Sequence, residues 1–171
     1  EDPYLIKQMY IGEDTITKVV IPEGVTTIEA YAFAKLTALE EVVLPSTLTR
    51  IAIGAFYGCE KLKTINLENV KFINERVFSG CALEEIDLSS VVAIGNYTFE
   101  KCKLNYVELP KSSQSLGIGA FYANKNLTSV DFKASKIKIG SYAFAECSQL
   151  IDMDINAAVI ASYAVYHCSN L

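Results

Sequence analysis

The apolar positions of this chain repeat with a period of 21 to 23 residues. Ile or Leu lies five residues before each marker of the period, and Cys usually lies three residues after it. The markers are Phe33, Phe56, Phe78, Phe99, Phe121 and Phe144, with Val165 in the same place. A fixed period of this kind is typical of a solenoid, in which one unit buries its apolar side chains only by stacking on the next.

Each unit contains a short segment in which apolar and polar residues alternate, such as residues 39–45 and 83–88. A period of two predicts a β-strand with one face inward and one outward. Pro22, Pro45 and Pro110 follow three of these segments, where a residue without an N–H group suits the end of a strand. From each Phe to the next Leu, apolar residues near i, i+3 and i+6 predict one helical or 3₁₀ turn. Each unit is therefore predicted to consist, in chain order, of a strand, a turn, a second extended segment and a short helical turn.

The repeat predicts one domain. Residues 16–171 form a solenoid of about seven units, and residues 1–15 form a lead-in or cap. At a strand spacing of about 4.8 Å the stack is roughly 35 Å long. The last residue, Leu171, occupies the first position of a further strand. Because repeat arrays need polar caps, we expect a chain truncated at its C-terminus, with an end covered by oligomerisation as the alternative.

The repeated motif resembles the BspA-type class of leucine-rich repeats. Residues 94–99 with Cys102 and residues 139–144 with Cys147 carry the pattern Ile-Gly-x-x-x-Phe-x-x-Cys. The departures are minor: Val165 replaces Phe, and Leu36 and Asn124 replace Cys. The resemblance implies a right-handed leucine-rich-repeat solenoid with short parallel strands on one face. It also implies a surface protein of bacteria or protists that acts in adhesion, without catalytic or cofactor-binding residues.

Composition narrows the classes of partner. The chain is 51% apolar and 20% charged, which is enough apolar sequence for a core. The formal net charge is −5. Without a basic excess, a nucleic acid or an anionic membrane surface is not expected as a partner. No apolar run reaches about 18 residues, so membrane insertion is not expected, and the first residues do not resemble a signal peptide.

The five Cys residues all lie in one column of the repeat. We expect buried small side chains with a weak S–H donor. Side chains of one column point the same way, which disfavours a disulfide, and no Cys-x-x-Cys pair suggests zinc. His167 precedes Cys168, which could indicate a nucleophile and its base, but adjacent residues point apart. We therefore expect no enzyme and no cofactor.

The outward strand positions contain a second column, which becomes acidic along the chain. Its members are Val20, Val43, Asn66, Asp87, Glu108, Asp131 and Asp154. Stacked carboxylates about 5 Å apart repel one another by under about 1 kcal/mol per pair in water. A basic partner relieves such repulsion. The candidate protein-binding residues are Asp87, Glu108, Asp131 and Asp154, with Glu85, Asp152 and Tyr106 beside them. A solvated acidic face without a ligand is the plainer alternative, and a calcium site is a weaker one.

Tyrosines on either side of the Phe column form another candidate surface, because tyrosine favours interfaces. They are Tyr31, Tyr57, Tyr97, Tyr122, Tyr142, Tyr163 and Tyr166. From the repeat and the resemblance together we expect a non-enzymatic protein-binding module of a cell-surface or secreted adhesin. Its partner would be a host matrix protein or a protein on another cell. A structural spacer and an intracellular interaction scaffold are the alternatives.

Overall fold

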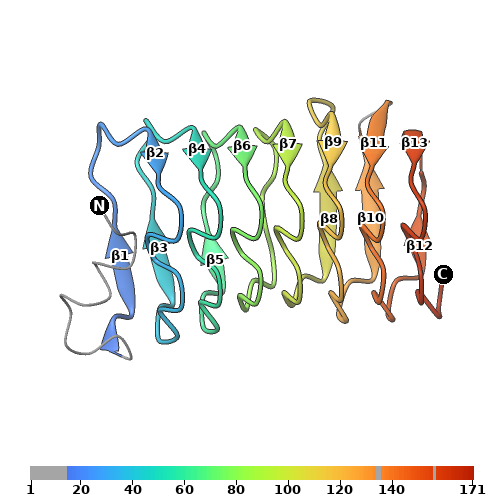
Figure 1. Ribbon diagram of the computed structural model, residues 1–171, viewed down its shortest axis with the longest axis horizontal. Helices are drawn as coiled ribbons and strands as arrows, with labels where there is room; N and C mark the ends of the chain where they lie inside the picture. Colours follow the sequence, from blue (N-terminus) through green and yellow to red (C-terminus); the bar gives the residue numbers. More distant parts are fainter. Residues whose placement is uncertain (1–14, 134–135, 156) are drawn as a thin grey trace.

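The computed structural model describes residues 15–133, 136–155 and 157–171, and they form a parallel-stranded β-solenoid with almost no helix (Figure 1). Successive coils stack along one long axis, with the first and the last described coils at opposite ends of the stack. The cap predicted for residues 1–15 lies outside the described residues, apart from Thr15. The predicted solenoid is thus confirmed, and each coil contributes one layer to it.

The alternating segments form the first strands of the coils. They pair in parallel as two three-stranded sheets, in the orders β1-β3-β5 and β12-β10-β8. The strands are β1 (Lys18–Val20), β3 (Glu41–Val43), β5 (Thr64–Ile65), β8 (Tyr106–Leu109), β10 (Ser129–Phe132) and β12 (Asp152–Met153). Their middle residues, such as Val42 and Val107, are buried and their neighbours are exposed, as the period of two predicts.

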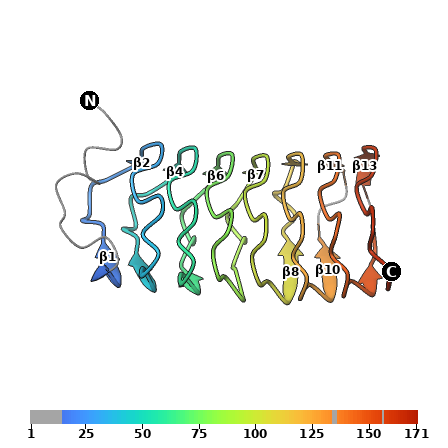
Figure 2. The ribbon, with the colours of Figure 1, turned by 60° about the horizontal axis from the view of Figure 1, so that its bottom comes forward.

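The second extended pieces form a longer sheet of seven parallel strands on another side of the solenoid (Figure 2). The strands are β2 (Thr27–Ile28), β4 (Arg50–Ile51), β6 (Phe72–Ile73), β7 (Ala93–Ile94), β9 (Ser115–Leu116), β11 (Ile137–Ile139) and β13 (Ala157–Ile160). The prediction that strands occupy one face was therefore incomplete. The Ile or Leu before each Phe has its own parallel partners, and this second sheet runs through the stack without a break.

The helical turn predicted around each Phe is not confirmed. The residues two before and two after every marker have a positive φ, as at Arg76 and Gly80 around Phe78. A left-handed residue on each side prevents a helix from continuing. The N–H groups between them point to the next coil instead: Phe56 donates to Val77 O at 3.0 Å and Phe78 to Thr98 O at 2.9 Å. The turn is therefore a third ladder of bonds between coils.

The Phe column forms the centre of the core. Phe56, Phe78, Phe99, Phe121 and Phe144 are fully buried, and successive rings from Phe33 to Phe144 stack with centroids 5.2 to 5.6 Å apart. Offset stacks of this kind add to the free energy of area burial. Each ring thus contributes to two interfaces, one with the coil before it and one with the coil after it.

The Cys column satisfies the carbonyl groups of the Phe column. All five thiols are free, and each Sγ donates to the Phe carbonyl of the preceding coil, as Cys102 does to Phe78 O at 3.2 Å. The same bond is made by Cys59, Cys81, Cys147 and Cys168. The predicted role as buried donors is confirmed. In the same column Asn124 Nδ2 donates to Phe99 O at 2.7 Å and Phe121 O at 2.9 Å.

Asn124→Cys is expected to stabilise the protein. The Asn124 Oδ1 atom is buried and accepts no hydrogen bond, whereas a thiol would keep the bond to Phe99 O and leave no unsatisfied oxygen. We expect a gain of about 1 kcal/mol, which raises Tm by about 2–4 °C. Thermal unfolding followed by circular dichroism measures it. Asn124→Ala, which removes the donor as well, should lower Tm, and a lower Tm for both variants would contradict this account of the column.

Candidate functional site

The outer face of the first strands presents two rows of side chains that run along the solenoid. The acidic row is the outward column predicted from the sequence, and Glu108 of β8 lies beside Asp131 of β10 in register. The other row, here called the upstream row, lies two residues earlier on each strand. It consists of Lys18, Glu41, Thr64, Glu85, Tyr106, Ser129 and Asp152. The two rows are about 7 Å apart along each strand.

The first sheet is interrupted in its middle. Strand β5 pairs only with β3, strand β8 pairs only with β10, and residues 83–88 between them are not a strand. Residues 83–88 still accept two bonds from the following coil, Lys103 N to Leu83 O at 2.9 Å and Asn105 N to Glu84 O at 3.1 Å. The interruption therefore lies between β5 and residues 83–88.

A change in repeat length accompanies the interruption. The step from Phe to the following Leu is five residues at Phe78 and Phe99 and six at the other Phe residues. The same change of step separates β8 from β10, and these two strands pair in register. The change in repeat length therefore does not by itself interrupt the sheet.

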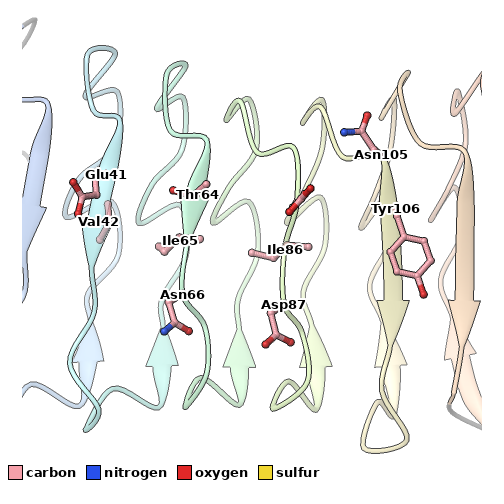
Figure 3. Close-up of a pocket in the computed structure, with 10 residues that line it drawn as sticks. Glu41, Val42, Thr64, Ile65, Asn66, Ile86, Asp87, Asn105 and Tyr106 are labelled. Carbon is pink, nitrogen blue, oxygen red and sulfur yellow. The ribbon is translucent and has the colours of Figure 1, made fainter.

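A groove of about 680 Å³ lies over the interruption (Figure 3). It runs between the two rows across four successive coils, and we call it the axial groove. Its floor is formed by Val42, Ile65 and Ile86, the middle residues of their segments. Its polar lining consists of Glu41, Thr64, Asn66, Glu85, Asp87, Asn105 and Tyr106. Three of the seven predicted binding residues, Glu85, Asp87 and Tyr106, thus come together at one place.

The other four predicted residues lie outside the groove and differ in their surroundings. Lys133 Nζ binds Asp131 Oδ2 at 2.6 Å, so that carboxylate has a cation of its own. Glu108 accepts a bond of 3.3 Å from the Tyr106 hydroxyl. Asp152 and Asp154 are exposed toward the C-terminal end of the array. The acidic row is therefore partly neutralised at Asp131, and its other carboxylates lie on both sides of that position.

The carboxylates of the axial groove are neutralised at one end only. Glu41 forms an ion pair of 2.7 Å with Lys18, whereas no ion pair of Glu85 or Asp87 occurs within the described part of the chain. Asp87 Oδ1 accepts one bond of 2.8 Å from Ser89 N. The negative charge of the groove is thus concentrated at Glu85 and Asp87.

Tyr106 forms the wall of the groove on the β8 side, with 45% of its surface exposed. Partial desolvation raises the pKa of its hydroxyl, and the carboxylates of Asp131 and Glu108 add to that effect. The hydroxyl therefore stays protonated well above neutral pH and serves as a donor. An exposed ring with a donor beside carboxylates suits the recognition of a cation.

Sequence reasoning missed the groove itself. It identified the acidic row and three members of the upstream row, Glu85, Tyr106 and Asp152. It did not recognise Glu41, Thr64 and Asn105 as neighbours of Asp87. The sequence offered no signal for the groove, because the shortened step after Phe78 recurs after Phe99, and the strand that follows Phe99 is paired.

His167 and Cys168 are engaged in separate contacts between coils. His167 Nδ1 lies 2.7 Å from Glu146 Oε1, and Cys168 Sγ donates to Phe144 O at 3.1 Å, so the two side chains do not face each other. Among the described residues no group of three His, Cys, Asp or Glu side chains is arranged to hold a metal ion. Nor does the described chain form a helix of the length and hydropathy needed to cross a bilayer.

The tyrosines near the Phe column divide into two kinds. The Tyr31 and Tyr97 rings lie against Gly54 and Gly119 of the next coil, where no side chain larger than glycine fits. These two rings cover the apolar side chains of the stack. Tyr142, Tyr163 and Tyr166, in contrast, are 36%, 59% and 44% exposed and pack against one another, with Tyr142 stacked on Tyr163 at 5.1 Å. These three rings form an exposed aromatic surface.

The comparisons with known proteins agree with the fold. The family model described as the BspA type leucine rich repeat region matches residues 6–82 and 71–171, with six copies. No functionally curated protein matches the chain at a significant level.

Solved structures show the same architecture. The T. pallidum leucine rich repeat protein is 31% identical, with a TM-score of 0.77, over 84% of this chain and 71% of that one. A leucine-rich repeat protein from Bacteroides ovatus is 28% identical, with a TM-score of 0.69, over 90% of this chain and 47% of that one. A leucine rich cell surface protein from Faecalibacterium prausnitzii shares the fold, with 18% identity and a TM-score of 0.53 over 91% of this chain and 65% of that one.

Proposed function

The chain belongs to the BspA-type leucine-rich-repeat family, and from that premise we propose that it is a non-enzymatic protein-binding module of a cell-surface or secreted bacterial adhesin. The observation that carries the proposal is the axial groove, in which the carboxylates of Glu85 and Asp87 and an exposed tyrosine lie on a continuous scaffold of stacked coils. A repeat scaffold is suited to this task, because extended surfaces follow from stacking.

Several features support binding in preference to catalysis. The buried thiols are committed to the Phe carbonyls, and the single His is paired with Glu146. The acidic row and the axial groove face outward along the array and not into an enclosed pocket. A partner with a basic surface would meet opposite charge there, which raises the rate and specificity of association more than the affinity.

The partner that we propose is a protein of the host matrix or of another cell. The structural likeness to a leucine rich cell surface protein fits this location. A structural spacer, by contrast, would hold other domains apart without binding through its own strand face. The two functions differ in one measurable property, namely binding by the isolated chain.

The test is binding of the chain to immobilised matrix proteins and to whole bacterial cells, at low and at high salt. A variant with Asp87, Glu108, Asp131 and Asp154 changed to Asn or Gln serves as the comparison. We expect binding that falls with salt and that the variant weakens by about tenfold, since close ion pairs at an interface contribute measurably. Because Lys133 already neutralises Asp131, the single change Asp131→Asn should contribute least. A folded chain that binds no member of the panel would favour the spacer.

A further inference from the structure

We propose that the axial groove binds an extended segment of a protein partner that carries arginine or lysine, with one cationic side chain between Glu85, Asp87 and the ring of Tyr106. This inference rests on the proposed protein-binding function and specifies what part of the partner is bound. Two independent features of the groove support it, namely its shape and its charge.

The shape fits a linear occupant. The groove spans four coils, from Glu41 to Tyr106, between two parallel rows of side chains (Figure 3). Four coils at a strand spacing of about 4.8 Å extend over about 14 Å, which equals about four residues of an extended peptide. Since the rows are about 7 Å apart along each strand, the space between them admits one peptide strand but no wider element.

The charge selects a basic occupant. Three carboxylates line the groove, and its lining contains no Lys or Arg. Glu41 already has Lys18 as a partner, so the charge that remains is that of Glu85 and Asp87. These two carboxylates lie on opposite rows, one on each side of the Ile86 backbone. A cation placed above Ile86 would be shared between them, and a guanidinium group could also stack on the exposed Tyr106 ring.

The length of the groove explains why a peptide, and not a small cation alone, is the expected ligand. A cation held by Glu85 and Asp87 fills one coil of the groove, whereas Thr64 and Glu41 line it one and two coils further along.

The test uses a fluorescent ten-residue peptide of alternating arginine and serine, with a peptide of alternating glutamate and serine as its counterpart. Binding to the whole 171-residue chain is followed by fluorescence anisotropy. The groove variant is Glu85→Gln with Asp87→Asn. The matched control is Glu29→Gln with Glu60→Gln, which removes the same charge from exposed positions outside the groove and outside the two rows.

We expect the chain to bind the arginine peptide and not the glutamate peptide. The groove variant should weaken binding by about tenfold and the control by less than about twofold, because charge attraction falls off over about a Debye length. Tyr106→Ala should also weaken binding, and circular dichroism should show all variants folded. No binding of the arginine peptide, or equal losses in groove variant and control, would overturn the proposal.

Failure of this inference is distinguishable from failure of the function on which it rests. If the groove variant retains full binding to a matrix protein or a cell that the unaltered chain binds, the groove proposal is wrong while the protein-binding function stands. If the unaltered chain binds the arginine peptide but no protein or cell of the panel, the groove is supported and the adhesin function is not.

Discussion

Phe99→Ala is expected to lower the free energy of unfolding by about 3–5 kcal/mol. The Phe99 ring is fully buried and stacks on Phe78 at 5.5 Å and on Phe121 at 5.2 Å, so its removal leaves a cavity in the middle of the array. In a solenoid each layer is stabilised mainly by its two neighbours, and the loss therefore weakens two interfaces at once. Against a typical domain stability of about 5–15 kcal/mol, this change is large.

Phe33→Ala is the matched control. Phe33 is partly exposed and stacks on Phe56 at 5.4 Å, with no second Phe partner among the described residues. Its removal should cost about half as much, since the transfer and cavity terms both shrink with burial. Urea unfolding followed by circular dichroism gives both values. Equal costs at the two positions would show that the stacking column is not the main coupling between coils.

The columns of the core could be predicted from the sequence, because buried positions repeat at a fixed period. Phe78, Cys81 and Leu83 occupy the buried places that the alignment of the repeats gives them. The turns could not be predicted in the same way. Ten of the fifteen described residues with positive φ are not glycine, and Arg76 and Tyr97 are examples. Apolar spacing alone fits a helical turn equally well, since it carries no information on the sign of φ.

The acidic row was predicted correctly as a set of outward positions, but its charge balance was not. Lys133 lies two residues after Asp131, just beyond the end of β10, and a period of two places both side chains on the same face, so the ion pair was predictable from the sequence. The Lys18–Glu41 ion pair was harder to predict from the sequence, because it depends on the register between β1 and β3. The axial groove depends on an interruption of backbone pairing between β5 and residues 83–88, and no periodicity in the sequence reports such an interruption.

The buried thiols lead to the second large effect, which is loss of stability at alkaline pH. Burial raises the pKa of the Cys147 thiol from 9.0 to about 12. Burial also raises the pKa values of Cys81 and Cys102. These groups stay protonated in the folded chain at pH values where the same thiols ionise in the unfolded chain. Folding therefore keeps its full stability below pH 9 and loses stability as the pH rises from there toward 12.

The size of the effect follows from linkage. Each such thiol lowers the free energy of unfolding by about 1.4 kcal/mol per pH unit within that interval, so Cys147 alone accounts for about 4 kcal/mol between pH 9 and 12. The raised pKa values of Cys81 and Cys102 act in the same direction, so the total slope should be steeper than that of Cys147 alone. Urea unfolding at several pH values, in the presence of a reductant, measures the slope.

Cys147→Ala isolates one thiol. This variant should be less stable at pH 7, because it loses the bond to Phe121 O and leaves a small cavity, but its stability should fall less steeply above about pH 9. Cys168→Ala should change the slope less, because Cys168 is only partly buried. If the free energy of unfolding stays constant from about pH 9 to 11, or if Cys147→Ala leaves its slope with pH unchanged, ionisation of the buried thiols does not cause the loss of stability at alkaline pH.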